Sequence, residues 1–422
     1  MPCSRTSSRA LAILLALGLL WIITPRVQAQ CALHQTARLP GTPGACGLSG
    51  CRTGYAVAMS GDGNTALVGA YGDNISNGSA SVYTRSISGA WVKQGATLTP
   101  TGGAGTNQYF GCAVALSADG NTALIGAYGD GQSLGAAYIF TRSAGVWSNT
   151  GGKLIDINGI GVVRHFGSSI AISGDGNTAA VGAYADNNFI GAVYFFARSG
   201  NTWANQGGKF IATIGVSFPQ YFGSSVALSH DGNTALVAAY GDNGFIGAAY
   251  NYNRFGTTWL EQQKFAPQGA AGASRYGTSV AISADGDTAI VGAEADNSYA
   301  GAVYICTRPV HLGGWGQPLP KFTQMGGVGL GTVGHAVSMS ANAKTFIAGA
   351  YTDNAALGSA FILDLAPTCA ADFNCSGSLS VQDIFDFLAA WFTLDPHADF
   401  NASGAISAQD IFDFLLVWFA GC

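Results

Sequence analysis

The clearest pattern of apolar and polar positions lies between Phe166 and Asn187. Two apolar runs, Ser168–Ser173 (SSIAIS) and Thr178–Tyr184 (TAAVGAY), have the composition of β-strands, and Asp175–Asn177 (DGN) joins them. Turns of this composition let the chain reverse direction through positive φ angles. The stretch therefore predicts a β-hairpin.

The same hairpin recurs along the chain at a nearly constant interval. Its leading glycine occurs in six copies, at Gly54, Gly111, Gly167, Gly223, Gly277 and Gly334. One such unit cannot bury both faces of its own sheet, so it must stack on its neighbours. The regular interval predicts an all-β protein, a six-bladed β-propeller.

A third and a fourth strand follow the hairpin. The third is seen as SASVYTR, GAAYIFTR, GAVYFFAR, GAAYNYNR and GAVYICTR, and the fourth begins with a tryptophan that recurs at the same interval. These tryptophans are Trp91, Trp147, Trp203, Trp259 and Trp315. Four antiparallel strands make one propeller blade. We expect the tryptophans to fill the core of the outer strands, with a sugar-stacking surface as the alternative.

The sixth copy is incomplete at its C-terminal end. Its third strand, GSAFILDL, runs into Pro367, and Ala371 occupies the next tryptophan position. Near the N-terminus, Leu33–Pro40 (LHQTARLP) resembles a surplus fourth strand. We expect it to complete the sixth blade, because such closure joins the chain ends and leaves no open sheet edge. A seventh, degenerate blade is the alternative.

Residues 1–29 have the pattern of a signal peptide. Arg5 and Arg9 precede an apolar run from Ala10 to Ile23, and a small-residue cleavage site, Val27–Ala29, follows. The run is short for a membrane span, although a retained signal anchor is an alternative. We expect a secreted, extracellular protein with no membrane span in its mature chain.

The charge is concentrated in the tail. Removal of the signal takes away three arginines and changes the net charge from −5 to −8, and seven aspartates fall between Asp372 and Asp413, where no Lys or Arg occurs. Nothing in the chain resembles a basic nucleic-acid-binding surface. The chain thus divides into a signal (1–29), a nearly neutral propeller (30–366) and an acidic tail (367–422).

The cysteines agree with export. Eight remain in the mature chain, and two groups of three flank the propeller: Cys31, Cys46 and Cys51, and Cys369, Cys375 and Cys422. Eight cysteines allow 105 pairings, so the connectivity stays open. The grouping predicts local disulfides in an oxidising compartment, and zinc is disfavoured because no paired CxxC is present.

The propeller segment resembles a known family. Phe110-Gly111, Phe166-Gly167 and Phe222-Gly223, followed by a Gly-Ala-Tyr triplet in most copies, look like the FG-GAP repeats of integrin-α-type propellers and their bacterial relatives. The resemblance covers roughly residues 31–365. After the Gly-Ala pair, where the FG-GAP motif has proline, this chain has tyrosine or, in one copy, Glu294. The DxDxDG calcium loop of integrin blades is absent. Calcium binding within the propeller is therefore not expected.

The tail contains a second, shorter repeat. ADFNCSGSLSVQDIFDFLAAWF and ADFNASGAISAQDIFDFLLVWF follow one another, and each reads as a calcium loop followed by a helix. The expected ligands of two calcium ions are Asp372, Asn374, Ser376, the Ser378 carbonyl and Asp383 in the first loop, and Asp399, Asn401, Ser403, the Ala405 carbonyl and Asp410 in the second. Ser380 and Ser407 are further ligands through water. The alternative is that Asp372 and Asp399 only cap turns.

This duplicated loop-helix unit is similar to dockerin domains. The last ligand of their EF-hand-like calcium loop is likewise Asp, where ordinary EF-hands have Glu. The ending Trp418–Cys422 (WFAGC) looks like the dockerin-type termini that finish in Gly-Cys. The resemblance implies a cohesin-like or other surface receptor as partner. Val381-Gln382 and Ala408-Gln409 occupy the loop positions that help choose a dockerin's receptor, and neither is a Ser-Thr pair.

Two sets of aspartates mark the blades. The first set lies in the hairpin turns, at Asp62, Asp119, Asp175, Asp231 and Asp285. The second set follows the second strand, at Asp73, Asp130, Asp186, Asp242, Asp296 and Asp353. We expect the first set to form turns and the second to fasten loops as Asx-turns, with a cation-binding or hydroxyl-binding circle of carboxylates as the alternative.

The predicted function is binding or adhesion without catalysis. No nucleophile, zinc-protease or phosphate-loop motif is present, and a protein or glycan ligand at the propeller loops is expected. One alternative is an extracellular polysaccharide-active enzyme with its site in the propeller funnel, for which Glu294 and Glu261 are the irregular acids. A passive spacer in the cell envelope is the third possibility.

Overall fold

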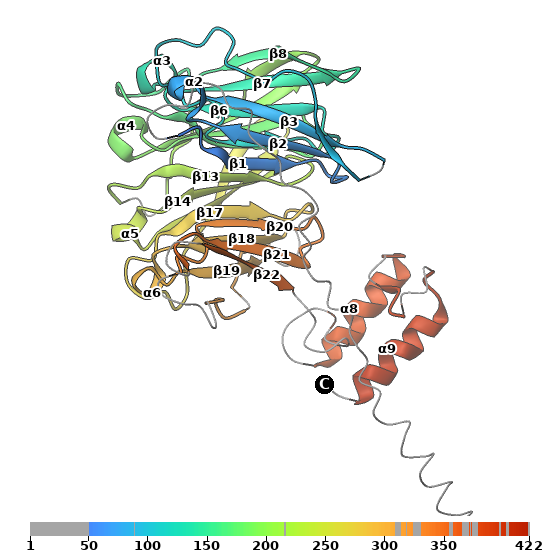
Figure 1. The fold of residues 1–422 in the computed structure, drawn as a ribbon. Coiled ribbons are helices and arrows are strands. Elements are labelled where there is room, and N and C mark those ends of the chain that lie inside the picture. Colours follow the sequence, from blue (N-terminus) through green and yellow to red (C-terminus); the bar gives the residue numbers. More distant parts are fainter. Residues whose placement is uncertain are drawn as a thin grey trace, which may run out of the picture. The chain divides into compact units, whose positions relative to one another are not determined.

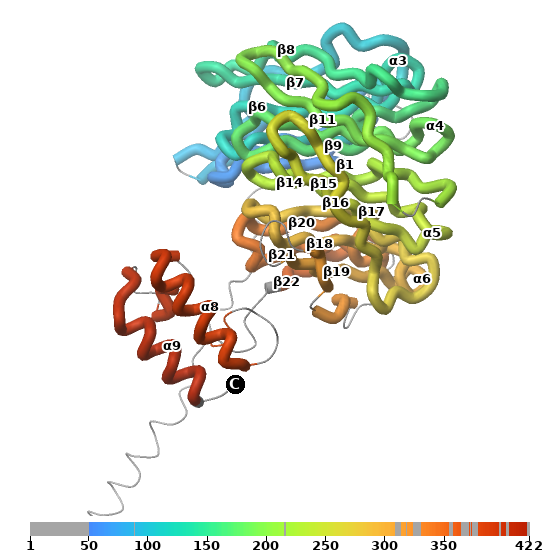
Figure 2. The backbone as a smooth tube through the Cα atoms, turned by 180° about the vertical axis from the view of Figure 1, so that it is seen from behind, coloured from blue at the N-terminus to red at the C-terminus, as the bar shows by residue number. Residues whose placement is uncertain are grey.

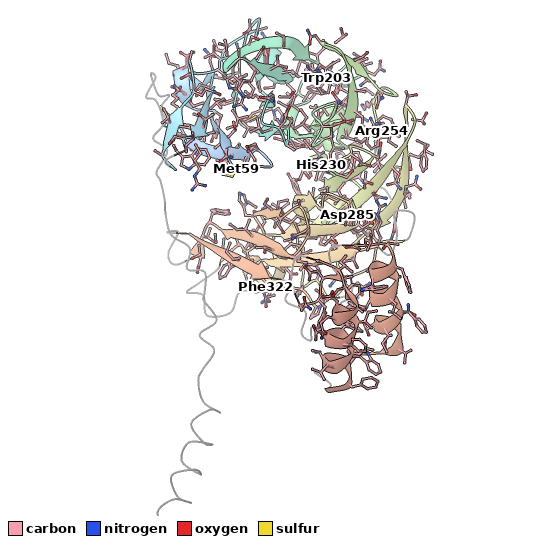
Figure 3. All side chains as sticks on the ribbon, turned by 90° about the vertical axis from the view of Figure 1, so that its right-hand side faces the viewer. Met59, Trp203, His230, Arg254, Asp285 and Phe322 are labelled. Carbon is pink, nitrogen blue, oxygen red and sulfur yellow. The ribbon has the colours of Figure 1, made fainter. Side chains whose placement is uncertain are left out.

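The computed structural model shows six β-sheets followed by two helices. It describes residues 50–87, 89–214, 217–308, 314–317, 319–323, 331–353, 358–364, 371, 373, 379–395, 398–401 and 405–420. Successive sheets follow one another around a common centre, with Met59 of the first sheet on the inner side (Figure 3). The prediction of a six-bladed β-propeller is confirmed, and the seven-bladed alternative is not.

Each predicted copy forms one antiparallel sheet, or blade (Figure 1). Blade 1 has β1 (Thr53–Met59), β2 (Thr65–Ala70), β3 (Ser79–Arg85) and β4 (Trp91–Lys93). Blade 2 has β5 (Val114–Leu116), β6 (Thr122–Ala127), β7 (Ala136–Ser143) and β8 (Val146–Leu154). Blade 3 has β9 (Phe166–Ile172), β10 (Thr178–Ala183), β11 (Ala192–Ser199) and β12 (Thr202–Asn205).

The remaining blades follow the same order. Blade 4 has β13 (Phe222–Leu228), β14 (Thr234–Ala239), β15 (Ala248–Phe255) and β16 (Thr258–Phe265). Blade 5 has β17 (Tyr276–Ile282), β18 (Thr288–Ala293) and β19 (Ala302–Thr307), and blade 6 has β20 (Ala336–Met339), β21 (Thr345–Ala350) and β22 (Ser359–Asp364). In blade 5, the described residues of the predicted fourth strand form the isolated bridges Thr307–Gly316 and Val303–Phe322.

The hairpin between β9 and β10 forms as predicted. Ala179 pairs with Ile172, and in the turn Asp175 accepts hydrogen bonds from the Ser173 hydroxyl and from the backbone N–H of Asn177 at 2.9 Å. The same turn recurs in the other blades, and blade 6 uses Asn342 in place of aspartate. The first set of aspartates therefore forms turns.

Small residues let neighbouring blades approach each other closely. A Cβ atom added to Gly126 of β6 would lie 2.0 Å from the carbonyl oxygen of Gly167 in the next blade. The repeat phenylalanine beside it, Phe166, is fully buried against Tyr194 of its own blade, with ring centroids 5.3 Å apart. The phenylalanine fills the blade, and the glycine provides the close contact between blades.

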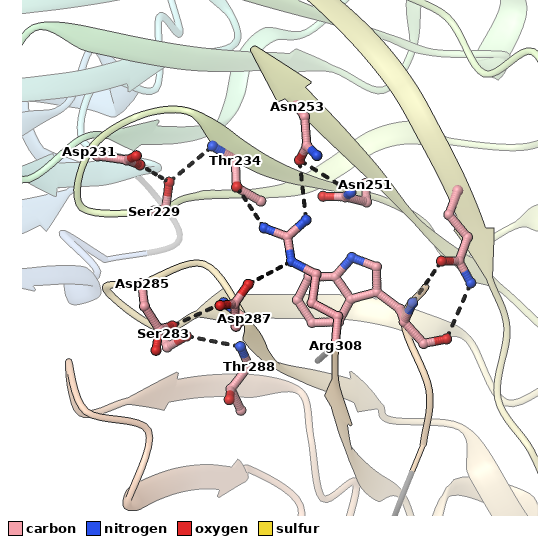
Figure 4. Close-up of polar contacts among 12 residues, drawn as sticks. Ser229, Asp231, Thr234, Asn251, Asn253, Ser283, Asp285, Asp287, Thr288 and Arg308 are labelled. Atoms are coloured by element: carbon pink, nitrogen blue, oxygen red, sulfur yellow. Dashed lines mark hydrogen bonds and ion pairs between the residues drawn. The ribbon is translucent and has the colours of Figure 1, made fainter. Parts of the chain in front are cut away.

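A second contact between blades comes from the arginine that ends the third strand. Arg308 of blade 5 donates to the Thr234 hydroxyl of blade 4 at 2.9 Å and pairs with Asp287 at 2.8 Å (Figure 4). Its guanidinium carbon lies 5.2 Å from the Trp315 ring. The equivalent pairs are Arg142–Thr65, Arg198–Thr122 and Arg254–Thr178. Of the repeat tryptophans, Trp259 and Trp315 are buried, as expected of core residues, whereas Trp91, Trp147 and Trp203 are half-buried.

The described residues form five of the six possible contacts between neighbouring blades. Parallel bridges such as Gly135–Phe166 join blades 1 to 6 in order, and none joins blade 6 to blade 1 among the described residues. A Cβ on Gly111 would lie 2.3 Å from the Ser79 oxygen, whereas one on Gly54 meets no described atom within 4 Å. The predicted closing strand, Leu33–Pro40, lies outside the described residues.

The tail contains the two predicted helices, α8 (Val381–Phe392) and α9 (Ala408–Ala420). Phe387 and Phe414 are fully buried between them and stack with ring centroids 4.2 Å apart. The side-chain N–H of Trp391 donates to the Ser407 carbonyl at 2.9 Å. Trp418 donates in the same way to the Ser380 carbonyl at 3.1 Å. The sequence repeat is thus also a structural repeat.

Several predictions concern residues outside the described part of the chain. These are the signal at 1–29 and five of the six clustered cysteines. Cys112 and Cys306, which lie outside both clusters, are buried free thiols. No helix in the described ranges is long and apolar enough to cross a membrane.

Candidate functional site at the turn face

One face of the propeller, here called the turn face, carries a short turn from each of blades 1 to 5. The turns α3 to α6 lie on the same side of the sheets (Figures 1 and 2). Their bounds are α2 (Asp73–Ser76), α3 (Asp130–Ser133), α4 (Asp186–Phe189), α5 (Asp242–Phe245) and α6 (Asp296–Tyr299). Each begins with an aspartate of the second set.

The backbone of these turns is left-handed. In α4, Asn187, Asn188 and Phe189 have φ angles of 51°, 55° and 68°. Left-handed backbone costs about 1–2 kcal/mol for each residue that is not glycine, and it persists only where the surroundings impose it. The Asx-turn prediction was incomplete, because it did not include a left-handed turn three residues long.

The buried aspartate imposes this conformation. Asp186 is fully buried, and its carboxylate accepts hydrogen bonds from the Ile160 backbone N–H at 3.1 Å and from the Tyr194 hydroxyl at 3.1 Å. Lys209, just after the fourth strand of the same blade, places its ammonium 2.6 Å from the carboxylate. Together these contacts join the turn to the third strand, to the segment after the fourth strand and to the connection from the previous blade.

The arrangement repeats across the propeller. The ion pairs are Lys153–Asp130 at 2.9 Å, Lys209–Asp186 at 2.6 Å, Lys264–Asp242 at 2.6 Å and Lys321–Asp296 at 2.8 Å. All six aspartates of the second set are buried. In blades 2 to 5 these carboxylates are neutralised by lysine, so they do not form a cation-binding circle.

A belt of large side chains runs along the turn face, and we call it the mouth belt. In blades 1 to 5 it consists of the residue two positions before the leading glycine of the repeat and the residue after the second strand, and in blade 6 it consists of His335 and Tyr351. The members are Arg52, Tyr71, Tyr109, Tyr128, His165, Tyr184, Tyr221, Tyr240, Arg275, Glu294, His335 and Tyr351. Antiparallel pairing brings the two positions of each blade to the same end of the sheet.

Neighbouring members of the belt contact one another across the blades. Tyr128 of blade 2 lies 5.1 Å from the His165 ring of blade 3, which in turn lies 5.0 Å from Tyr184. The other ring contacts are Tyr71–Tyr109, Tyr109–Tyr128, Tyr184–Tyr221, Tyr221–Tyr240 and His335–Tyr351, at 4.5 to 6.2 Å. The belt is therefore continuous over several blades.

The belt is partly exposed and almost uncharged between Tyr71 and Tyr240. Burial raises the pKa of Tyr128 well above its ordinary value, and burial together with Tyr221 raises the pKa of Tyr240 to about 12. Burial lowers the pKa of His165. At neutral pH this arc presents neutral rings and hydroxyl groups.

The belt residues two positions before the leading glycine have a strained backbone. Arg52, Tyr109, His165, Tyr221 and Arg275 have φ between 52° and 55°. Large side chains rarely adopt this conformation, and such strain gathers at functional sites.

Glu294 interrupts the run of tyrosines. Its carboxylate accepts from Arg275 at 2.9 Å and contacts the His335 ring nitrogen at 2.7 Å. Burial raises the pKa of Glu294, but the hydrogen bonds and charges of His335 and Arg275 outweigh burial and hold the pKa below its ordinary value. Glu294 is thus an ionised hydrogen-bond acceptor, which does not suit the general acid of a glycosidase.

We expect the contribution of Glu294 to stability to disappear in acid. The pKa of Glu294 is lower in the folded state than in the unfolded state, where it is about 4.3. The stabilising contribution is therefore complete at a pH above the unfolded-state pKa, and it is lost as the pH falls through the folded-state pKa. Glu294→Gln should therefore lower the melting temperature at pH 7 and leave it almost unchanged at pH 3. Equal losses at both pH values would contradict the assignment.

Glu261, the other irregular acid, holds a loop in place. It accepts hydrogen bonds from the Thr213 and Ile214 backbone N–H groups at 3.0 and 3.2 Å and from the Tyr252 hydroxyl at 2.9 Å. These partners belong to blade 4 and to the connection that leads into it. The contacts give Glu261 a structural role.

The structure describes five of the ten predicted calcium ligands: Asp383, Asp399, Asn401, Ala405 and Asp410. Asp372, Asn374, Ser376, Ser378 and Ser403 lie outside the described residues. No group of three or more His, Cys, Asp or Glu in the described ranges is arranged to hold a metal ion.

Asp383 and Asp410 occupy equivalent positions at the start of the two helices. Asp383 is buried and accepts from the Ser380 backbone N–H at 2.8 Å. Asp410 accepts from the Ser407 backbone N–H at 2.7 Å and from the Asn401 backbone N–H at 3.3 Å. The second loop thus brings two predicted ligand residues together, and hard oxygen donors of this kind fit calcium.

The tail helices expose a repeated apolar stripe. Phe385 and Phe392 on α8 are 61% and 74% exposed, and Phe412 and Phe419 on α9 are 66% and 76% exposed. The two members of each pair are two helical turns apart, on one side of the helix. Exposed stripes of this size are typical of interaction surfaces.

Comparison with known proteins agrees with the repeat pattern. Residues 91–140 and 259–306 match the family model described as FG-GAP repeat. These two segments of the propeller are similar to FG-GAP repeats. Each matched segment begins at the tryptophan of one fourth strand and ends in the third strand of the next blade, so each match spans a blade boundary. No curated protein matches the chain.

Comparison with solved structures finds two other proteins. Hydrazine synthase from Kuenenia stuttgartiensis has a TM-score of 0.50 and 15% identity, covering 84% of this chain and 85% of that chain. A putative 6-phosphogluconolactonase from Bacteroides fragilis has a TM-score of 0.48 and 14% identity, covering 74% of this chain and 84% of that chain. At 15% identity, the match to hydrazine synthase shows a similar fold and nothing further.

Sequence reasoning missed the mouth belt. His165 directly precedes Phe166 and occupies the same place in the repeat as Tyr109 and Tyr221. Alignment of the residue before each FG pair would have revealed the position. The residue type changes from blade to blade, so no repeated letter marked it.

Proposed function

We propose that this protein is a secreted binding protein without catalytic activity. The FG-GAP propeller presents the mouth belt to a protein or glycan ligand, and the dockerin-like tail, folded around two calcium ions, attaches the propeller to a cohesin-like or other surface receptor. The observation that carries the proposal is the continuous, partly exposed mouth belt. Continuous aromatic surfaces with fixed polar groups are typical of binding sites.

The exposed stripe on the tail helices supports attachment through the tail. Phe385 and Phe412 occupy equivalent positions of the two repeats, so each helix offers a similar surface. Calcium would hold the loops that orient the helices, through Asp383, Asp410 and the other predicted ligands. The tail would therefore attach to its receptor only when calcium is present.

Sedimentation with the cell envelope tests this function. We expect the mature chain to sediment with envelope fragments in calcium and to be released by a chelator. Phe385→Ser combined with Phe412→Ser should weaken this binding at least tenfold. Each phenylalanine that becomes buried against the receptor contributes roughly 1.5–3 kcal/mol to the free energy of binding.

The control is Phe255→Ser, which changes an exposed phenylalanine of the propeller and should leave sedimentation unchanged. Binding that ignores both the chelator and the two tail substitutions would overturn attachment through the tail.

We also propose that Leu33–Pro40 closes the propeller as the fourth strand of blade 6. In blades 2 to 5, a lysine from the fourth strand or the segment just after it pairs with the buried aspartate of the turn. The equivalent buried aspartate of blade 6 is Asp353. Arg38-Leu39 matches Lys264-Phe265 in spacing, so Arg38 would supply the corresponding charge.

Cysteine cross-linking tests the closure. The register of β15 with β16 places Asn251 opposite Gln263, and the equivalent pair in blade 6 is Ile362 with Ala37. Ala37→Cys with Ile362→Cys should form a disulfide under mild oxidation, because directly opposed residues of antiparallel strands lie within bonding reach. The pair Ala37→Cys with Val146→Cys should not. Equal yields from both pairs would contradict closure.

A further inference from the structure

A pocket of about 490 Å³ opens beside the mouth belt in blade 5. Its lining includes Phe245, Arg275, Asn297, Ser298 and Tyr299. Volumes in this range accommodate small organic ligands or single residues of a polymer. The lining combines two aromatic rings with an amide, a hydroxyl and a guanidinium.

The guanidinium of Arg275 is held in place from three sides. Its carbon lies 6.0 Å from the Phe245 ring and 5.5 Å from the Tyr299 ring, and its Nη1 donates to Glu294 at 2.9 Å. That bond is the one side-chain hydrogen bond of Arg275 within the described residues. The rest of the guanidinium fork is therefore oriented and can donate to a ligand.

The pocket walls are fixed by the buried ion pair of the blade. Asp296 accepts from Lys321 at 2.8 Å and from the Ala271 backbone N–H at 3.1 Å, and Asn297 donates its own N–H to the Ala271 carbonyl at 3.1 Å. These bonds hold the connection at 271–275 against the turn α6. Asn297, Ser298 and Tyr299 stay exposed on a left-handed backbone, with φ of 49°, 57° and 69°.

The charge of the pocket argues against an anionic ligand. Arg275 is already paired with Glu294, which also contacts His335 on its other oxygen. A ligand carboxylate would have to compete with Glu294 for the same guanidinium. Hydroxyl groups can accept from the remaining N–H groups without that competition, and they can also donate to the Asn297 amide oxygen.

We propose that this pocket binds one neutral sugar residue of a glycan. Tyr299 would pack against the C–H face of the sugar ring, and Arg275, Asn297 and Ser298 would hydrogen-bond its hydroxyl groups. This inference rests on the proposed function, because it names the ligand class of the turn face. Among the five described turns, α6 alone combines an aromatic residue at its last position with an arginine before the first strand of the same blade.

Affinity electrophoresis of the full mature chain tests the proposal. We expect at least one neutral polysaccharide among galactomannan, laminarin, xyloglucan and dextran to retard the protein in native gels. Tyr299→Ala should weaken the retardation at least tenfold, and Arg275→Lys should weaken it as well while keeping the charge. Alanine, like tyrosine, has a Cβ atom, so Tyr299→Ala does not change the strain of the positive φ angle at residue 299.

Phe189→Ala is the matched control, because Phe189 has the same place in α4 and a φ of 68°. It should bind like the unmodified protein. Retardation by no neutral polysaccharide, retardation by polygalacturonate alone, or equal losses in the Tyr299 and Phe189 variants would each overturn the sugar site. The proposed function has a separate readout, since calcium-dependent sedimentation with the envelope does not require this pocket.

Discussion

Lys209→Met is expected to lower the free energy of unfolding of the propeller by about 3–5 kcal/mol. The substitution leaves the Asp186 carboxylate buried without its counter-charge. Asp186 has no exposed side-chain surface, and Lys209 is only 12% exposed, so water cannot replace the ammonium. Urea denaturation followed by tryptophan fluorescence measures the change.

The double variant Asp186→Asn with Lys209→Met distinguishes the ion pair from lost packing. An asparagine at 186 still accepts from the Ile160 N–H and still contacts the Tyr194 hydroxyl, but it carries no charge. We therefore expect it to recover most of the lost stability. Lys344→Met, on the exposed turn of blade 6, is the control and should change stability by less than about 0.5 kcal/mol. A loss that the double variant does not recover would contradict the assignment.

Millimolar calcium is expected to raise the melting temperature of the tail by about 10 °C or more above its value in chelator. Two sites at about ten times their dissociation constant together contribute roughly 3 kcal/mol, and a small domain gains about 4–8 °C per kcal/mol. Scanning calorimetry of the whole chain measures the tail transition beside that of the propeller. Identical transitions in calcium and in chelator would sink the calcium proposal.

Substitutions within the tail locate this calcium effect. Asp410→Asn removes a carboxylate from the second loop and should reduce the difference between calcium and chelator by about half, since one of two sites is affected. That difference is the proper readout, because Asp410 also accepts from Ser407 and Asn401 without metal. Asp386→Asn, on the α8 helix outside the loop, is the control and should retain the full calcium effect.

The repeat architecture was predictable because its signals are local. Alternation of apolar residues, the Asp-Gly turns and the tryptophan period all act within a few residues, so hairpins such as β9 with β10 followed from the sequence. The helices after Ser380 and Ser407 were predictable for the same reason. Each has a Ser followed three residues later by an Asp that accepts from its backbone, together with an apolar helical period.

The left-handed turns were not predictable in the same way. Ile75 and Phe189 have no intrinsic preference for positive φ, yet both adopt it, at 54° and 68°. Contacts distant in the sequence impose this backbone. For Phe189 they include the Lys209–Asp186 pair and the hydrogen bond from Ile160 to Asp186. Propensity alone would have placed an ordinary Asx-turn here.

By itself, the sequence determined the number of blades, the strand order within a blade and the paired helices of the tail, because neighbouring residues encode strands, turns and helices. Only the tertiary structure decided which polar groups meet. Stacking of blades brings Tyr128 to His165 and Arg275 to Phe245. Such contacts depend on how whole sheets are arranged about a shared centre, and no local pattern of residues records that arrangement.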